Sequence, residues 1–475
     1  MTVTRTINGL KRRCPGSRIW LAAAALIVAT GTNPALAHVS EQGLVLLLPT
    51  TFYMVSGVAA VVLTVFLVAL LPEKYAARIF SRTALFSVAE SKLATVTSLA
   101  ALGLLMFLVY VGLNGSHDPL ANPLPLFIWT VWWVGIVCLQ AVFGNLWHWL
   151  NPWTGLYRLI NAAPLLTLPA KVGVWPGIAA FLGFAAFALA DLAPDDPARL
   201  ARFVGGYWAY TFIGMLLFGG EQWLSRGDCF TLLLRNYSRL SPFSIEGNTL
   251  HFGVPGWRLV GGRMASVSGG VFILVVLASG SFDGLNETFW WLGKIGINPL
   301  EFPGRSAVVW STLTGLLVGG ILLPGIFAVT VFLGLLVVGE QAKLAEAFGR
   351  LSLAVLPIAL AYHFSHYLSV LLVNGQYALA AATDPWAVGA DYLGLGVFHV
   401  TTGFFNTSDT VKLIWLSQAV AVVAGHILAV LMSHAIAVDI FGNARKATLS
   451  QIPTALFMVG YTVFGLWLLA SPRGL

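Results

Sequence analysis

Residues 411–440 read VKLIWLSQAVAVVAGHILAVLMSHAIAVDI, and this stretch decides the fold. It carries formal charge only at Lys412 and Asp439. A helix of roughly 20 apolar residues spans the hydrocarbon core of a bilayer, so the stretch is long enough to cross a membrane. It nevertheless contains His426 and His434. Because an ionisable side chain at membrane depth is costly, each of these residues is a candidate for function.

The same pattern recurs along the whole chain, which is 475 residues long, 58% hydrophobic and only 9% charged. Run length and breaker residues predict an all-α integral membrane protein with about ten transmembrane helices. We expect these helices at residues 43–71, 91–113, 126–150, 174–193, 203–225, 264–281, 306–338, 351–374, 411–440 and 452–470. The seventh run is longer than one crossing needs, and Pro324 within it is expected to kink or divide the helix.

The first apolar run is typical of a secretory leader rather than of a structural helix. A basic segment is followed by an apolar stretch at residues 19–28 and by the small-x-small sequence Ala35-Leu36-Ala37. Residues 1–37 are therefore predicted to be a signal peptide, and residues 38–475 the polytopic transmembrane domain. Cleavage would leave His38 as the mature N-terminus; the alternative is an uncleaved signal anchor.

Basic residues are distributed unequally between the two sides of the predicted helices. With His38 outside, the loops after odd-numbered helices hold 15 Lys and Arg residues, whereas the outer segments hold six. Cytoplasmic loops are enriched in Lys and Arg, so the counts favour a bacterial inner-membrane protein with both termini in the periplasm. The net charge of +7 then follows from topology, and we expect the lipid bilayer, not nucleic acid, as the partner.

Two loops are predicted to be more than connectors. Residues 236–262 alternate polar and apolar positions around Glu246-Gly247-Asn248, which indicates a short hairpin on the cytoplasmic side. Residues 383–410 form an aromatic, Gly-rich outer loop. This loop either covers a site near the outer face or lies as a reentrant segment in the membrane interface.

Three histidines are the strongest candidates for a shared site. His363 and His366 are spaced i, i+3 and so lie on one helix face. At ~1.5 Å per residue they lie roughly 18–23 Å from the inner end of their helix, and His426 lies roughly 22 Å from the outer end of the next. Neutral imidazole is a common ligand of divalent metal ions, so the three predict a metal centre for hydrolysis. The alternatives are a proton or substrate relay and interhelical hydrogen bonds.

Five further residues are weaker candidates. A mature N-terminal His38 would offer an α-amine and an imidazole to a metal. His434 lies about 12 Å along the helix from His426, too far to share its ion. It is expected at the inner level with His148 and Glu221, as a second polar site, a proton exit or interfacial side chains. The Asn145 amide is expected to bind a neighbouring helix or a substrate.

Three segments together resemble one bacterial membrane family. They are WWVG…GNLWHWLNPW within residues 132–153, the text from Tyr362 to Gln376, and AGHILAVLMSHAIA at residues 424–437. The family is that of the membrane-bound fenitrothion hydrolases, which act on organophosphorus esters, and the resemblance runs along most of residues 38–475. After the last histidine this chain has Ala435 in place of the family's usual acidic residue, which puts a role for that position in doubt.

The resemblance implies hydrolysis of an organophosphorus triester such as fenitrothion to a nitrophenol and a dialkyl thiophosphate. A site reached from the lipid suits an apolar ester, and a metal-activated water could attack phosphorus. The rival class is a metal-handling or proton-coupled small-molecule transporter that uses the same histidines. A second membrane subunit is a further candidate partner, and this chain would be a structural subunit if that partner held the active site.

Overall fold

The computed structural model describes residues 45, 47–70, 75, 78–88, 93–262, 266–301, 304–396 and 399–473. Within these residues, nine helical segments are long and apolar enough to cross a membrane. The chain is therefore a helical multi-pass membrane protein, as its composition predicts. The expected signal peptide at residues 1–37 and the candidate His38 lie outside the described residues.

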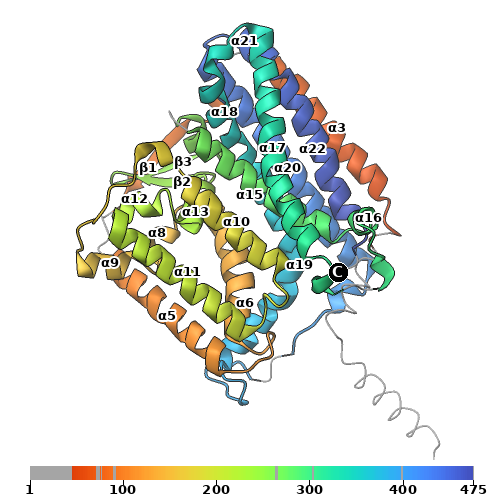
Figure 1. Ribbon diagram of the computed structural model, residues 1–475. Helices are drawn as coiled ribbons and strands as arrows, with labels where there is room; N and C mark the ends of the chain where they lie inside the picture. Colours follow the sequence, from red (N-terminus) through yellow and green to blue (C-terminus); the bar gives the residue numbers. More distant parts are fainter. Residues whose placement is uncertain are drawn as a thin grey trace, which may run out of the picture.

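One group of helices comes from the first half of the chain and occupies the lower left of Figure 1. It consists of α5 (Ala94–Asn114), the continuous series α6 (Pro123–Leu126), η1 (Phe127–Ile136) and α7 (Val137–Phe143), and α11 (Pro197–Phe218). Helix α5 packs against both α6 and α11. Four short helices belong to the same half: α8 (Trp147–Leu150), α9 (Thr154–Ile160), α12 (Gly220–Leu224) and α13 (Cys229–Ser238).

A second group combines the first described helix with helices from the second half of the chain. It consists of α3 (Thr50–Ala69), α17 (Val309–Val338), α20 (Ser408–Phe441) and α22 (Ile452–Ala470). Helices α20 and α22 both pack against α3, and α22 also packs against α17. In Figure 1 these helices form the long bundle at the upper right. Shorter helices here are α18 (Leu344–Ser352) and α21 (Ala444–Ser450).

Three helices join the two groups and surround the centre of the molecule. They are α10 (Trp175–Ala190), α15 (Val267–Asn286) and α19 (Leu356–Thr383). Helix α15 contacts α10, α17 and α19, while α19 contacts η1 on one side and α20 on the other. Every residue of α15 from Phe272 to Ser279 is buried, because this helix is covered on all sides. Polar groups on α15 therefore face protein or a cavity.

The loops gather at two opposite ends, as alternating crossings require. At one end, strand β1 (Arg82–Ser87) pairs with β3 (Thr249–Gly253), and Lys446 forms an ion pair with Glu340. At the other end, Trp386 packs on Phe107 of α5, and Thr288 pairs with the backbone of Arg473. The first end corresponds to the predicted cytoplasmic loops, and the second to the predicted outer segments.

A three-stranded antiparallel sheet of order β1-β3-β2 lies at the first end. The segment interpreted as a hairpin contains β2 (Phe243–Glu246) and β3, with Glu246 paired to Thr249 across the turn at Gly247 and Asn248. The third strand, β1, comes from a loop that the sequence analysis did not assign to a strand. Its six residues are all exposed, so it lacks the half-buried alternation by which a strand is recognised.

Two predicted helices differ from their expected form. The fifth predicted span, residues 203–225, is built as α11 followed by a break at Gly219, and α11 is not among the nine segments that qualify by length and composition. The seventh span is a single helix, α17, which continues through Pro324. Its 30 residues extend ~45 Å at 1.5 Å per residue, which is more than one perpendicular crossing needs.

Candidate functional site

A cavity of about 580 Å³ lies between η1, α10, α15 and α19. One part of its wall is aromatic and comes from Trp129 and Trp133 of η1 and Phe181 and Phe184 of α10. The other part carries ionisable side chains: Asp195, Asp283, Glu287, Arg305, His363, His366 and Arg473. A cavity with an apolar wall and a few converging polar groups is the usual form of a small-molecule site.

Asp283 of α15 and His366 of α19 form the polar centre of this cavity. The His366 Nε2 lies 3.0 Å from Asp283 Oδ2, and the two side chains are only 7% and 11% exposed. The Tyr367 hydroxyl donates a hydrogen bond of 2.5 Å to the same carboxylate oxygen. A carboxylate that accepts from Nε2–H fixes the imidazole tautomer and leaves Nδ1 as the basic nitrogen.

Two polar atoms at this site have no hydrogen-bond partner among the residues that the structure describes. The His366 Nδ1 and the Tyr362 hydroxyl are both buried without a hydrogen bond. Both lie against Gly284: a Cβ at that position would be 1.8 Å from the Tyr362 oxygen and 3.6 Å from the His366 Nδ1. Because buried polar groups are nearly always paired, these two atoms mark a place for a water molecule or a ligand group.

His363 lines the same cavity but is held in another way. Its Nε2 lies 2.8 Å from the Trp133 carbonyl oxygen, to which it donates, and its ring meets the Trp133 ring edge-on. Trp133 belongs to the ten-residue π-helix η1. A π-helix is rare and often marks a functional site. One nitrogen of His363 is therefore held by η1.

Charged groups surround the end of the cavity next to the C-terminal segment. Arg473 lies 3.8 Å from Glu287, which is 31% exposed. Burial raises the pKa of Glu287 above its ordinary range; the Arg473 charge acts against this shift and the Asp283 charge adds to it. The backbone of residues 472–473 pairs with Thr288 and Phe289, so the C-terminal segment is tied to the wall of the cavity.

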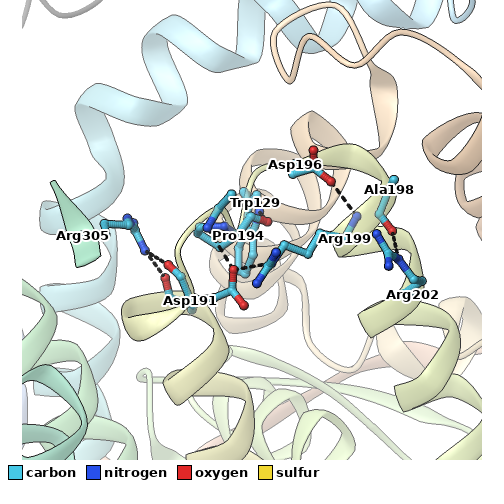
Figure 2. A network of polar contacts seen from close by, with 10 residues as sticks. Trp129, Asp191, Pro194, Asp196, Ala198, Arg199, Arg202 and Arg305 are labelled. Atoms are coloured by element: carbon cyan, nitrogen blue, oxygen red, sulfur yellow. Dashed lines mark hydrogen bonds and ion pairs between the residues drawn. The ribbon is translucent and has the colours of Figure 1, made fainter. Parts of the chain in front are cut away.

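Figure 2 shows how the neighbouring outer loop is held. Arg305 donates to the carbonyl oxygens of Ala188 and Asp191 at the C-terminus of α10, at 3.0 and 3.3 Å. The Asp191 carboxylate pairs with Arg199 at 2.7 Å. The Trp129 indole N–H donates to the Pro194 carbonyl at 3.3 Å. These contacts fix both Trp129 and Arg305 in the cavity wall.

His426 does not line this cavity. Its Nδ1 bonds to the Val422 carbonyl of its own helix at 2.8 Å, and the nearest aromatic ring on another helix is Tyr461 of α22, with centroids 6.5 Å apart. Helices α19 and α20 meet where a Gly425 Cβ would be 2.6 Å from the Ala361 Cβ. His426 is thus about one turn deeper than His363, and it faces α22 instead of η1.

No group of three His, Cys, Asp or Glu side chains that could hold a metal ion occurs among the residues that the structure describes. The predicted donor set of His363, His366 and His426 is divided between two faces of the α19–α20 pair. These residues as placed do not fit a single ion, and we derive no reaction step through one. That the protein binds a divalent metal ion stays a prediction.

The weaker candidates among the described residues lie outside this cavity. His434 is buried on α20, and its Nε2 has no hydrogen-bond partner within the described part of the chain. His148 is exposed on α8, and Glu221 is exposed and pairs with Arg235 at 2.9 Å. Asn145 is exposed and accepts a hydrogen bond of 3.4 Å from Gln140. These residues are not brought together with the cavity of Asp283 and His366.

Sequence reasoning missed the partner of His366. The predicted sixth span ends at residue 281, so Asp283 was assigned to an outer loop, but α15 continues to Asn286 and carries Asp283 inside. A carboxylate within one turn of the end of an apolar run was the available signal. The outer carboxylates Asp384 and Asp391 do not line the cavity; they accept hydrogen bonds from their own loop at Gly389 and Gly396.

Comparison with known protein families, curated proteins and solved structures finds no match to this chain.

Proposed function

We propose that this protein is a membrane-embedded hydrolase of uncharged, apolar esters, with organophosphorus triesters such as fenitrothion as its substrate class. One observation carries the proposal: His366 lines the cavity with its Nε2 held by Asp283, and its Nδ1 is buried without a hydrogen-bond partner among the described residues. A histidine oriented by a carboxylate and free at its second nitrogen is the arrangement of a general base. The class of ester follows from the sequence resemblance.

In the proposed reaction, a water molecule attacks phosphorus while His366 Nδ1 removes a proton from it. The new P–O bond forms as the bond to the aryl oxygen breaks, and the nitrophenolate leaves with the electron pair. The products are a dialkyl thiophosphate and the phenol, with the proton on His366 returned to solvent or to the leaving group. Asp283 acts as a positioning residue, because its negative charge stabilises the imidazolium that forms.

The rest of the cavity suits such a substrate. The aromatic wall of Trp129, Trp133, Phe181 and Phe184 offers ring faces to a nitroaryl group. The charges of Arg473 and Glu287 lie toward the outer end, where an anionic product would leave. An uncharged ester and a charged product thus meet different parts of one cavity.

The test is nitrophenol release by the purified full chain in detergent, with an uncharged nitrophenyl dialkyl thiophosphate and the corresponding anionic diester as substrates. We expect turnover of the triester and none of the diester. Metal analysis of the same preparation, before and after dialysis against a chelator, tests the separate prediction that a divalent ion binds. Absence of triester turnover under all of these conditions would remove the hydrolase proposal.

A second candidate is a proton-coupled transporter of small molecules. The observation that favours it is the series of ionisable side chains from His366 and Asp283 to Glu287 and Arg473 at one end of the cavity. Intramembrane Asp, Glu and His residues often relay protons in transporters. A transporter would need sealed vesicles and a gradient, whereas the hydrolase would work without either.

We further infer that the protein lies in a bacterial inner membrane with both ends of the chain in the periplasm. The loops that carry most of the Lys and Arg residues come together at the end that holds the sheet. The cavity with Asp283 and His366 would then open toward the periplasm. Whether a second membrane subunit joins the chain stays a prediction.

A further inference from the structure

A second chamber of about 490 Å³ lies beside the first, between α5, η1 and α11. Its wall includes Ala101 and Leu105 of α5, Trp132 of η1, Val204 of α11 and Phe230 of α13. Nearly all of this wall is apolar, and the described residues that form it carry no Asp, Glu, Lys, Arg or His. We call it the apolar chamber.

Three tryptophans of the apolar chamber have their N–H groups bound to neighbouring residues. Trp147 donates to the Thr231 hydroxyl at 2.9 Å, and Trp153 donates to the Trp208 carbonyl at 3.0 Å. The Trp129 N–H is bound to Pro194 in the outer loop (Figure 2). Because these donors are already bound, the rings present apolar surface to the chamber and few groups that would hold a polar or charged ligand.

The apolar chamber shares part of its wall with the cavity of His366. Trp129 and Phe184 line both spaces, and their rings stack with centroids 5.9 Å apart and an interplanar angle of 29°. Phe184 also contacts Trp133, which lines the cavity of His366 but not the apolar chamber. Aromatic rings shared by both walls therefore separate a largely apolar space from the cavity that holds Asp283 and His366.

We propose that the apolar chamber is the first binding site of an uncharged aromatic ester drawn from the lipid phase, from which the ester passes the Trp129–Phe184 partition to reach His366. The inference rests on the proposed hydrolase function and assigns its substrate class and route. The apolar wall admits the neutral ester and rejects an anion, since burying an unpaired charge among apolar groups is costly. An ester bound in the apolar chamber lies next to the cavity of His366 and can reach it without passing through water.

The test measures binding separately from turnover. The probe is 4-nitrophenyl diethyl phosphate, an uncharged nitroaryl triester, and binding is followed by quenching of tryptophan emission in the purified full chain. Two variants fill the chamber from two different helices: Ala101→Phe on α5 and Val204→Phe on α11. Matched controls add the same ring on the outside of the same helices, where a Cβ meets nothing within 4 Å: Gly103→Phe and Gly206→Phe.

We expect each filling variant to bind the probe about tenfold more weakly or worse, and each control to bind it as the wild type does. The anionic probe 4-nitrophenyl ethyl phosphate should not quench the tryptophan emission of any of these proteins. Unchanged binding in both filling variants, or equal loss in the controls, would overturn the proposal. Melting temperature and elution volume identify any variant that does not fold. If one filling variant does not fold, binding by the other filling variant tests the proposal.

Failure of the hydrolase function gives a different result. If the triester binds the wild type and not the filling variants, while no protein releases nitrophenol, the chamber is a binding site and the proposed chemistry is wrong. If the wild type releases nitrophenol and the filling variants do so with unchanged KM, the chemistry stands and the chamber is not the route.

Discussion

Asp283 and His366 together form the polar centre of the cavity, and each depends on the other. Asp283 accepts from both His366 and Tyr367. Asp283→Asn would replace the carboxylate by a neutral amide that no longer stabilises the imidazolium. We therefore expect kcat for triester hydrolysis to fall by about 100-fold or more, with KM nearly unchanged.

His426→Ala is the matched control for the expected fall in kcat at the Asp283–His366 pair. If the three histidines held one metal ion, His363→Ala, His366→Ala and His426→Ala would lower activity and bound metal equally, and double variants would add little. Because His426 faces α22, we expect its variant to keep most of its turnover. Equal losses at His366 and His426, together with loss of metal, would support the metal centre and contradict the arrangement described above.

The raised pKa of Glu287 predicts that the stability of the folded protein depends on pH. Its pKa is raised in the folded protein, chiefly by burial, so its ionised form is less favourable there than in the unfolded chain. Below the pKa that Glu287 has in the unfolded chain, its carboxyl is protonated in both the folded and the unfolded state and has no effect on stability. As the pH rises through the raised folded pKa, wild-type stability falls, and above it the loss is complete.

Glu287→Gln removes that ionisation. We expect the melting temperature of the variant to exceed that of the wild type at neutral pH and to approach it at pH values below the ordinary carboxylate pKa. Thermal unfolding in detergent across this range provides the measurement. A difference that is constant with pH, or that grows toward acid, would show that the Glu287–Arg473 pair outweighs the cost of burial.

At the level of single residues, the sequence located the costly side chains but not their partners. His363 and His366 stand out in an apolar run, and both line the cavity. Their grouping with His426 relied on depth alone. Depth along a helix follows from residue spacing. The direction in which a residue faces depends on how the helix is rotated, and for α20 this rotation is set by its contacts with α3, α19 and α22.

Among the helices, α19 and α20 approach each other closely where Gly425 lies. A Cβ at Gly425 would lie 2.6 Å from the Ala361 Cβ and 2.7 Å from the Pro357 carbonyl oxygen, which is backbone and cannot move aside easily. The helices are also joined by Ser365 and Gln418, each of which donates to the carbonyl of the other at 2.8 and 2.9 Å.

Gly425→Ala should therefore destabilise the protein by about 1–3 kcal/mol, because the two backbones must separate. Gly375→Ala on α19 is the control, since a Cβ there meets nothing within 4 Å and alanine favours the helix. The two variants are compared by thermal unfolding in the same detergent. Equal stability of the two variants would show that the close approach at Gly425 is not needed.

The helices themselves were the most predictable elements. Nine of the expected runs are long apolar helices, because uninterrupted apolar length is a direct consequence of bilayer thickness. The π-helix η1 and the strand β1 were not predicted. The first depends on packing between Trp133 and α19, and the second depends on pairing with a strand more than 160 residues away in the chain.

For the molecule as a whole, the orientation in the membrane is the most general expectation. A phosphatase that is active only in the periplasm, fused after Arg473, should be active, and the same fusion after Lys446 should be inactive. Lys446 lies at the end that holds the sheet and pairs with Glu340 there. The reverse pattern of activity would place the cavity of His366 on the cytoplasmic side.

His366 is proposed to act as the general base of a membrane-embedded ester hydrolase. The most direct measurement is nitrophenol release from an uncharged nitrophenyl phosphotriester by detergent-purified wild type and by His366→Gln, without a membrane gradient. We expect steady release by the wild type and a loss of about 100-fold or more in the variant, at equal protein stability. Equal release by the two proteins, or none by the wild type, would contradict the claim.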